Sequence, residues 1–222
     1  MSENRARPAL LKAGSLDPED LGVFEWDATL ATDYLTCSNG NRSVEWTTTP
    51  IPADAGPDDL ASSPPVWIPI PTRAYLHSGV FQWDFVVEEM AKGQIGVGFM
   101  LDCDIGPDWG FFGYLGSSNS AWAYDPSTGD VVCSTRSIEG GLPKFEDRRS
   151  GVVTVRLDLP REAEGSARFV VNGIASSPVA LPEGAVVVPA GCLLEKSQRV
   201  SLAHFLRTDP TPKAGPLSCS PS

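Results

Sequence analysis

Short runs of alternating apolar and polar residues recur along this chain, and they limit its possible folds more than any other feature. Phe81, Trp83 and Phe85 are each separated by one polar residue, so a strand would place all three rings on one face. Such runs are bounded by Gly, Pro, Asn and Asp at short intervals, as in all-β sandwiches. The sequence shows neither a fixed-period repeat nor strands alternating with long helices. The pattern therefore predicts an all-β fold of two packed antiparallel sheets.

Several runs can be assigned to individual strands. Residues 33–38 and 43–46 flank Asn39-Gly40, a dipeptide typical of tight hairpin turns. In the run 93–100, glycines take alternate positions, which predicts that a backbone or a large ring lies close above that face. Further strands are expected at 78–87, 152–159, 169–171 and 200–205.

Composition along the chain predicts one folded domain at residues 21–207, with tails at 1–20 and 208–222. The sequence has 222 residues, enough for a single domain with its own core. The Pro- and Asp-rich stretch 47–72 is expected to be a long connection inside that domain, because the residues before it are too few to bury a separate core.

The tryptophans divide into core and loop positions. We expect Trp83 and Trp122 to be buried, because a large ring gains most from burial. Trp67 lies in a segment with prolines on both sides. Proline cannot donate a hydrogen bond to a neighbouring strand, so we expect Trp67 to lie outside a central strand and to be partly exposed.

Charge restricts the kind of partner. The chain has 17 basic and 28 acidic residues, for a net charge of -11. Its average field repels phosphate backbones and anionic membrane surfaces. We expect no nucleic-acid partner and no insertion into a membrane, and we expect the protein to be a monomer unless it is part of an assembly.

Cysteine usage and the first residues indicate a compartment. The five cysteines are odd in number, scattered and never spaced as CxxC, so neither a disulfide framework nor a zinc site is indicated. The chain begins without the apolar run of a signal peptide, and no stretch is long and apolar enough for a membrane span. We therefore expect an intracellular, cytoplasmic protein with reduced thiols.

A search for chemistry-bearing motifs gives little. The histidines, His77 and His204, have no oriented nucleophile beside them in the sequence, so structural or surface roles are favoured over catalysis. Asp102-Cys103-Asp104 has two carboxylates that could share a hard cation, but a solvated loop is the favoured interpretation. The sequence thus predicts no enzyme, no catalytic residue, no metal site and no cofactor.

The order of several motifs resembles the SPRY domain, and the upstream block resembles the larger B30.2 (PRY plus SPRY) arrangement. Ser78-Gly79 with Trp83-Asp84 is similar to the family's opening strand, and Ile95-Gly96-Val97-Gly98 is similar to its "VGV" strand. The remaining similar pieces, in chain order, are Asp27 to Trp46, Trp109-Gly110 to Tyr114, Trp122 to Tyr124, Val153 to Asp158, Phe169 to Gly173, Val188 to Ala190 and Val200 to Phe205. Gln82 departs from the pattern, since the family prefers an aromatic ring there.

The resemblance implies a bent two-sheet β-sandwich, a concanavalin-like jelly roll, that binds proteins or peptides through loops at one end. The loops expected to do so are 66–77, 103–118 and 134–148. Arg73, Tyr75 and Tyr114 occupy places that resemble the family's ligand-facing loops. For Tyr114, packing between strands is an equally good interpretation.

Loop residues add three further predicted contacts. Trp109 follows Gly106-Pro107-Asp108, and an aromatic ring in a rigid loop can anchor a peptide. Arg136 and Lys144 flank Gly140-Gly141 and could hold an acidic side chain, though ordinary solubilising charge explains them as well. Two other functions stay open: a structural subunit of a larger viral or multi-protein assembly, and a glycan-binding sandwich.

Overall fold

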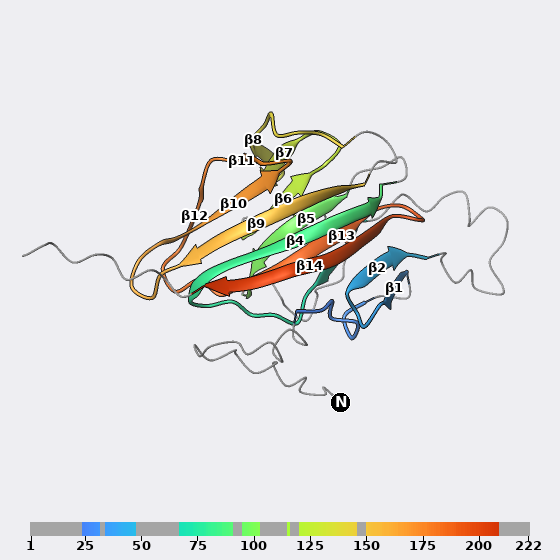
Figure 1. The fold of residues 1–222 in the computed structure, drawn as a ribbon, viewed down its shortest axis with the longest axis horizontal. Coiled ribbons are helices and arrows are strands. Elements are labelled where there is room, and N and C mark those ends of the chain that lie inside the picture. Colours follow the sequence, from blue (N-terminus) through green and yellow to red (C-terminus); the bar gives the residue numbers. More distant parts are fainter. Residues whose placement is uncertain are drawn as a thin grey trace, which may run out of the picture.

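The computed structural model describes residues 24–31, 34–47, 67–90, 95–102, 115, 120–145 and 150–208. These residues form two antiparallel sheets packed face to face (Figure 1). The described part contains no helix that could cross a bilayer.

The larger sheet has eight strands, and the smaller sheet has six. In spatial order the larger sheet contains β1 (Leu35–Ser38), β2 (Ser43–Trp46), β14 (Arg199–Thr208), β4 (Gly79–Glu89), β9 (Gly151–Leu159), β10 (Gly165–Val171) and β11 (Ile174–Ala175), and β12 (Val179–Leu181) also pairs with β10. The smaller sheet contains β3 (Ile68–Pro71), β13 (Val187–Leu193), β5 (Gly96–Leu101), β6 (Ala121–Asp125), β7 (Asp130–Cys133) and β8 (Arg136–Glu139).

The predicted period of two is confirmed in the central strands. Side chains of β4 alternate between buried and half-buried along nearly the whole strand. Its partner β9 alternates in the same way, and Trp83 lies opposite Val155 in their shared register. Each strand therefore gives one face to the space between the sheets.

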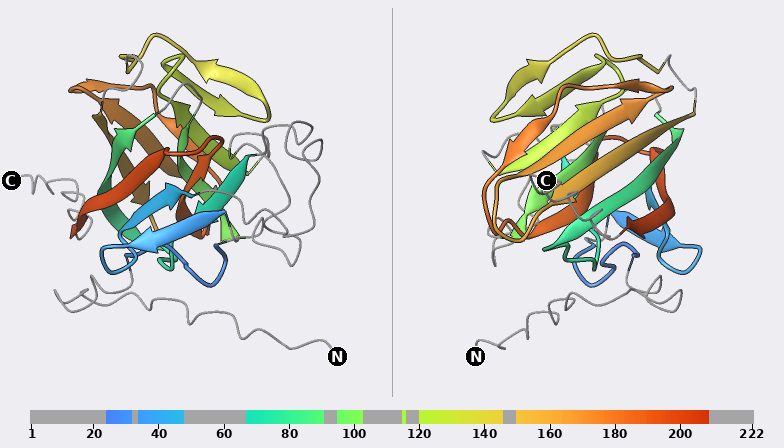
Figure 2. Two further views of the ribbon diagram at one scale, coloured as in Figure 1. Left: turned by 90° about the vertical axis from the view of Figure 1, so that its right-hand side faces the viewer. Right: turned by 60° about the vertical axis from the view of Figure 1, so that its left-hand side comes forward.

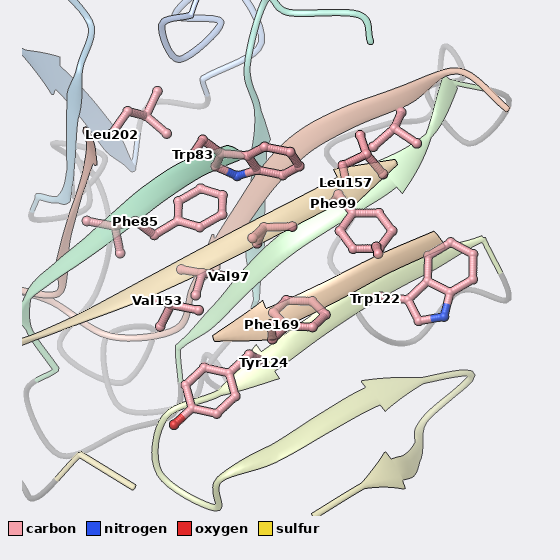
Figure 3. Packing of buried hydrophobic residues seen from close by; sticks show 14 of the residues in the cluster. Trp83, Phe85, Val97, Phe99, Trp122, Tyr124, Val153, Leu157, Phe169 and Leu202 are labelled. Carbon is pink, nitrogen blue, oxygen red and sulfur yellow. The ribbon is translucent and has the colours of Figure 1, made fainter. Parts of the chain in front are cut away.

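Aromatic rings from both sheets meet in that space (Figure 3). Phe99 of the smaller sheet stacks on Trp122 with ring centroids 5.2 Å apart and on Phe169 of the larger sheet at 5.8 Å. Trp83 meets Phe85 edge to face at 6.4 Å. Trp83 is 0% and Trp122 is 8% exposed, so the prediction that both are core residues is confirmed.

The Asn-Gly hairpin is also confirmed. β1 and β2 pair in antiparallel register, and Asn39, Gly40 and Asn41 all have positive φ, at 53°, 62° and 59°. Asn and Gly tolerate this left-handed conformation better than other residues.

The stretch 47–72 was expected to be an irregular connection, but its end is a strand. β3 forms a ladder with β13 and is buried along its whole length. It lies at the edge of the smaller sheet, where Pro69 and Pro71 need not donate to a second neighbour. Trp67 just before it is half-buried, as predicted. Residues 48–66 of the connection lie outside the described part.

The segment 24–31 joins the two sheets near β3. Trp26 is fully buried and stacks on Phe85 with ring centroids 6.0 Å apart. Its backbone N–H donates to the Asn41 carbonyl at 2.7 Å, and the Asp27 N–H donates to the Pro71 carbonyl at 2.9 Å. One short segment thus contacts the β1–β2 hairpin, β3 and the core at the same time.

The glycine prediction is confirmed at Gly98. A Cβ atom there would lie 2.0 Å from the Trp122 carbonyl oxygen in the neighbouring strand β6. Backbone cannot retreat from such an overlap without breaking the β5–β6 ladder.

We therefore expect Gly98→Ala to lower the free energy of unfolding by at least about 2 kcal/mol, as overpacked interiors do. Gly140→Ala is the matched control, because its Cβ would meet only the movable Asp130 carboxylate at 2.7 Å. Urea denaturation of both variants measures the difference. Equal effects of the two substitutions would contradict the close approach.

Candidate functional site

The outer face of the smaller sheet carries a second apolar cluster, separate from the main core. Its buried members are Met100, Leu115, Ala121, Ala123, Val188, Ala190 and Cys192. Trp67 and Tyr75 pack against them and are partly buried. We call this set the outer cluster. Because the inner faces of β5, β6 and β13 already line the main core, the smaller sheet buries side chains on both faces.

Small residues form the floor of the outer cluster. Gly98 lies opposite Ala190 of β13 on one side and opposite Ala123 of β6 on the other. Ala123 and Ala190 are both 0% exposed. A row of Gly and Ala leaves room for larger side chains to lie close to the sheet, so the floor suits flat aromatic rings.

Tyr75 reaches the outer cluster from an extended segment that follows β3. The Thr72 N–H donates to the Pro189 carbonyl at 2.8 Å, and Leu76 exchanges two 2.8 Å backbone hydrogen bonds with Val187. Thr72 and Leu76 are buried, whereas Arg73, Tyr75 and His77 are exposed or half-buried. Tyr75 and His77 flank the paired and buried Leu76, so these two side chains lie on the side of the chain away from Leu76.

Leu115 is the one described residue of the predicted loop 103–118. Its side chain is buried in the outer cluster, and its backbone N–H donates to the Cys192 Sγ at 3.4 Å. Burial raises the pKa of the Cys192 thiol to about 12, so this sulfur stays neutral and acts as a packing group. The predicted contacts Trp109 and Tyr114 lie outside the described residues.

Arg73 is held by the segment that carries Trp26. Its Nη1 lies 2.9 Å from Glu25 Oε1, and its backbone N–H donates to the Glu25 carbonyl at 2.9 Å. The hydrogen bond to the Glu25 carboxylate raises the pKa of Arg73. The side chain remains 50% exposed, so it borders the surface around Tyr75 with a fixed positive charge.

Arg136 and Lys144 do not meet. Arg136 lies opposite Cys133, at the turn between β7 and β8. Lys144 lies by the turn between β6 and β7, where its Cγ would be 3.1 Å from a Cβ at Gly129. Both side chains are exposed, but they occupy opposite ends of the β7–β8 hairpin, which projects at the top of the molecule in Figure 2. They are therefore two separate surface charges.

The outer face of the larger sheet differs from the outer cluster because polar pairs cross it. Thr154 Oγ1 donates to Asp84 Oδ1 at 2.6 Å, and Arg156 Nε donates to Gln82 Oε1 at 3.1 Å. Gln82, which departs from the SPRY pattern, is thus engaged across the β4–β9 ladder.

The two histidines belong to different segments of the chain. His77 is half-buried just before β4, and burial, together with the charges of Arg207 and Arg161, lowers its pKa. His204 is exposed, with a φ of 47°, where the β14–β4 register shifts. The described residues hold no group of three or more His, Cys, Asp or Glu side chains arranged for a metal ion. Of the pair Asp102 and Asp104, only Asp102 is described.

Sequence reasoning missed two parts of this surface. Leu115 was not singled out, because an apolar residue in a loop does not by itself show which sheet it will cover. The proximity of His77, Arg161 and Arg207 was also missed, since they are distant in the sequence. Trp67 was predicted to be partly exposed within the binding loop 66–77, but it was not named as a contact.

The lowered pKa of His77 predicts a pH effect on stability. The unfolded chain takes up a proton near the ordinary pKa of 6.5, before the folded protein does. Protonation therefore favours unfolding as the pH falls from above 6.5 to below the folded pKa. We expect the free energy of unfolding of the wild type to fall relative to His77→Asn over that window in urea denaturation. A relative rise would contradict the assignment.

Comparison with known proteins bears on the fold. No family model matches the sequence, and no curated protein matches it. Among solved structures, the TRIM65 PSpry domain aligns with a TM-score of 0.57 and 14% identity, covering 86% of this chain and 97% of that chain. A human SPRY domain aligns with a TM-score of 0.55 and 11% identity, covering 77% and 94%.

The SPRY domain of human HERC1 gives a TM-score of 0.51 and 15% identity, covering 80% of this chain and 96% of that chain. The likeness extends over most of this chain and nearly the whole of each neighbouring domain. The two-sheet sandwich of this chain therefore has the SPRY-domain fold, which confirms the resemblance seen in its sequence motifs.

Proposed function

We propose that this protein is a non-enzymatic binding module that takes a protein segment or peptide onto the outer cluster, with Trp67 and Tyr75 as its anchors. The observation that carries the proposal is the packing of these two half-buried rings against the buried residues of the outer cluster. Partly exposed aromatic side chains with rigid support contribute much of the binding energy in many protein interfaces.

The rigidity of the site supports this function. Tyr75 lies in a segment fixed by backbone hydrogen bonds to Pro189 and Val187 of β13. The floor beneath it consists of three hydrogen-bonded strands. A partner that docks here has little protein conformational entropy to remove, and this favours affinity.

The other predicted contact residues have different places relative to the outer cluster. Arg73 borders Tyr75 along one segment. Trp109 and Tyr114 lie outside the described residues, and we propose them as further contacts of the same partner. Arg136 and Lys144, at opposite ends of the β7–β8 hairpin, would contact only a partner large enough to extend beyond the cluster.

The proposal predicts that the double variant Trp67→Ala/Tyr75→Ala binds its partner at least about tenfold more weakly, since each anchor ring lost at an interface centre commonly costs 1 kcal/mol or more. Affinity capture from native lysate with quantitative mass spectrometry identifies the partner. Titration calorimetry of that partner with both proteins then measures the change.

The matched control is Tyr34→Ala/Trp46→Ala. These two rings are half-buried as well and pack against each other with centroids 5.6 Å apart, but they belong to the edge of the larger sheet. Equal recovery of every partner by the wild type and both variants would overturn the proposal. In that case, self-association in light scattering that is lost on removing residues 1–20 and 208–222 would favour a structural subunit.

A further inference from the structure

One histidine and two arginines come together near Tyr75, where the chain passes from β3 of the smaller sheet to β4 of the larger sheet. His77 follows Tyr75 in the same extended segment. Arg161 lies in the turn after β9, and Arg207 lies near the end of β14. The strands β14, β4 and β9 are neighbours in the larger sheet, and this region is where β4 begins and β14 and β9 end (Figure 1).

The strand register brings these residues together. Gly79 of β4 lies opposite Leu159 of β9. His77 is two residues before Gly79 and Arg161 is two residues after Leu159, so both follow directly from the end of this ladder. On the other side of β4, Arg207 lies opposite Phe81. Both arginines lower the pKa of His77 through their charge, in keeping with this arrangement.

Arg207 is the most firmly placed of the three. Its guanidinium carbon lies 5.6 Å from the centroid of the Phe81 ring, and its Nε atom is buried. A Cβ at Gly79 would lie 3.4 Å from that Nε, so the absence of a side chain at Gly79 leaves room for the guanidinium. A cation–π contact with Phe81 therefore holds the positive charge of Arg207 at this end of the sandwich.

This region is unusual in a chain of net charge -11. Glu162 and Glu164 belong to the same turn as Arg161, and both are exposed. Asp158 near the end of β9 is exposed as well. The charges that lower the pKa of His77 are nevertheless those of Arg207 and Arg161, and both are positive. A positive local field at the end of the Tyr75 segment would oppose the overall repulsion of anions.

We propose that His77, Arg161 and Arg207 form an anion subsite that receives an Asp or Glu carboxylate of the segment docked at Tyr75. The inference rests on the proposed function and names the class of partner: an acidic peptide with an apolar anchor. In an extended chain, residues two apart are separated by roughly 6.6 Å and point to the same side. Tyr75 and His77 have this spacing, so a peptide lying alongside them would carry its carboxylate two residues from its anchor.

The test uses the full chain and two matched peptide libraries, randomised around a fixed Trp. One library has Asp two residues before and after the Trp, and the other has Asn at the same positions. The tightest Asp peptide and its Asn counterpart are then titrated, at low and high salt, against the wild type, Arg161→Glu and Arg168→Glu. Arg168 is the matched control because it is also exposed and its reversal changes the net charge equally, but it lies opposite Arg156 within the β9–β10 ladder.

We expect Arg161→Glu to weaken the Asp peptide by about tenfold or more, and Arg168→Glu by less than about twofold at high salt. The Asn peptide should bind the wild type and Arg161→Glu about equally, because it lacks the carboxylate. Comparing the effect of Arg161→Glu on the Asp peptide and on the Asn peptide isolates the carboxylate contact. Equal weakening by both arginine reversals, or equal affinity of the Asp and Asn peptides for the wild type, would overturn the subsite.

The outcomes separate this inference from the proposed function. Suppose that Trp67→Ala/Tyr75→Ala abolishes binding of both peptides, while Arg161→Glu and Arg168→Glu change the affinity for the Asp peptide equally. The docking surface is then supported, and the anion subsite is contradicted. If neither library binds, or if that double variant binds both peptides as the wild type does, the docking surface itself fails and the subsite fails with it.

Discussion

The aromatic layer between the two sheets is the interaction on which the rest of the structure depends. Phe99 contacts Trp122 within its own sheet and Phe169 across the interface, so one ring joins both layers. Each strand that contributes to this layer must alternate, because side chains of a strand point to its two faces in turn. The positions that face inward therefore fix which positions of each strand face outward. On the larger sheet, the outward positions of β4 and β9 carry polar pairs such as Asp84 with Thr154.

The smaller sheet has an apolar outer face instead of a polar one, and this face carries the candidate site. Its outward positions carry Gly98, Ala123 and Ala190 instead of polar residues, and they too are buried. A side chain at Gly98 would overlap the backbone of β6, and Gly98 lies between Ala123 and Ala190 of the outer cluster.

Contacts between distant parts of the chain hold the site in place. Trp26 packs into the core while its segment bonds to Pro71 and Arg73 at the end of β3. At the opposite end of β13, the buried Gln198 accepts hydrogen bonds from the backbone of Leu194 and Glu195 and donates one to the Met90 carbonyl. Its polar atoms are satisfied without water, as buried amides require. The extended segment that carries Tyr75 is therefore fixed by strands and turns on both sides.

The sequence by itself determined the fold class, the Asn-Gly hairpin, the strands of the central ladders and the burial of Trp83 and Trp122. These features are local: they depend on alternation along single strands and on residues that accept positive φ. β3 was not predicted, because prolines exclude a central strand and only the sheet order reveals that Ile68–Pro71 lie at an edge. The tertiary structure alone decided that Leu115 covers the smaller sheet, that Arg136 and Lys144 are separated, and that His77, Arg161 and Arg207 converge. Such groupings follow from strand register and sheet order, which depend on contacts between residues far apart in the chain.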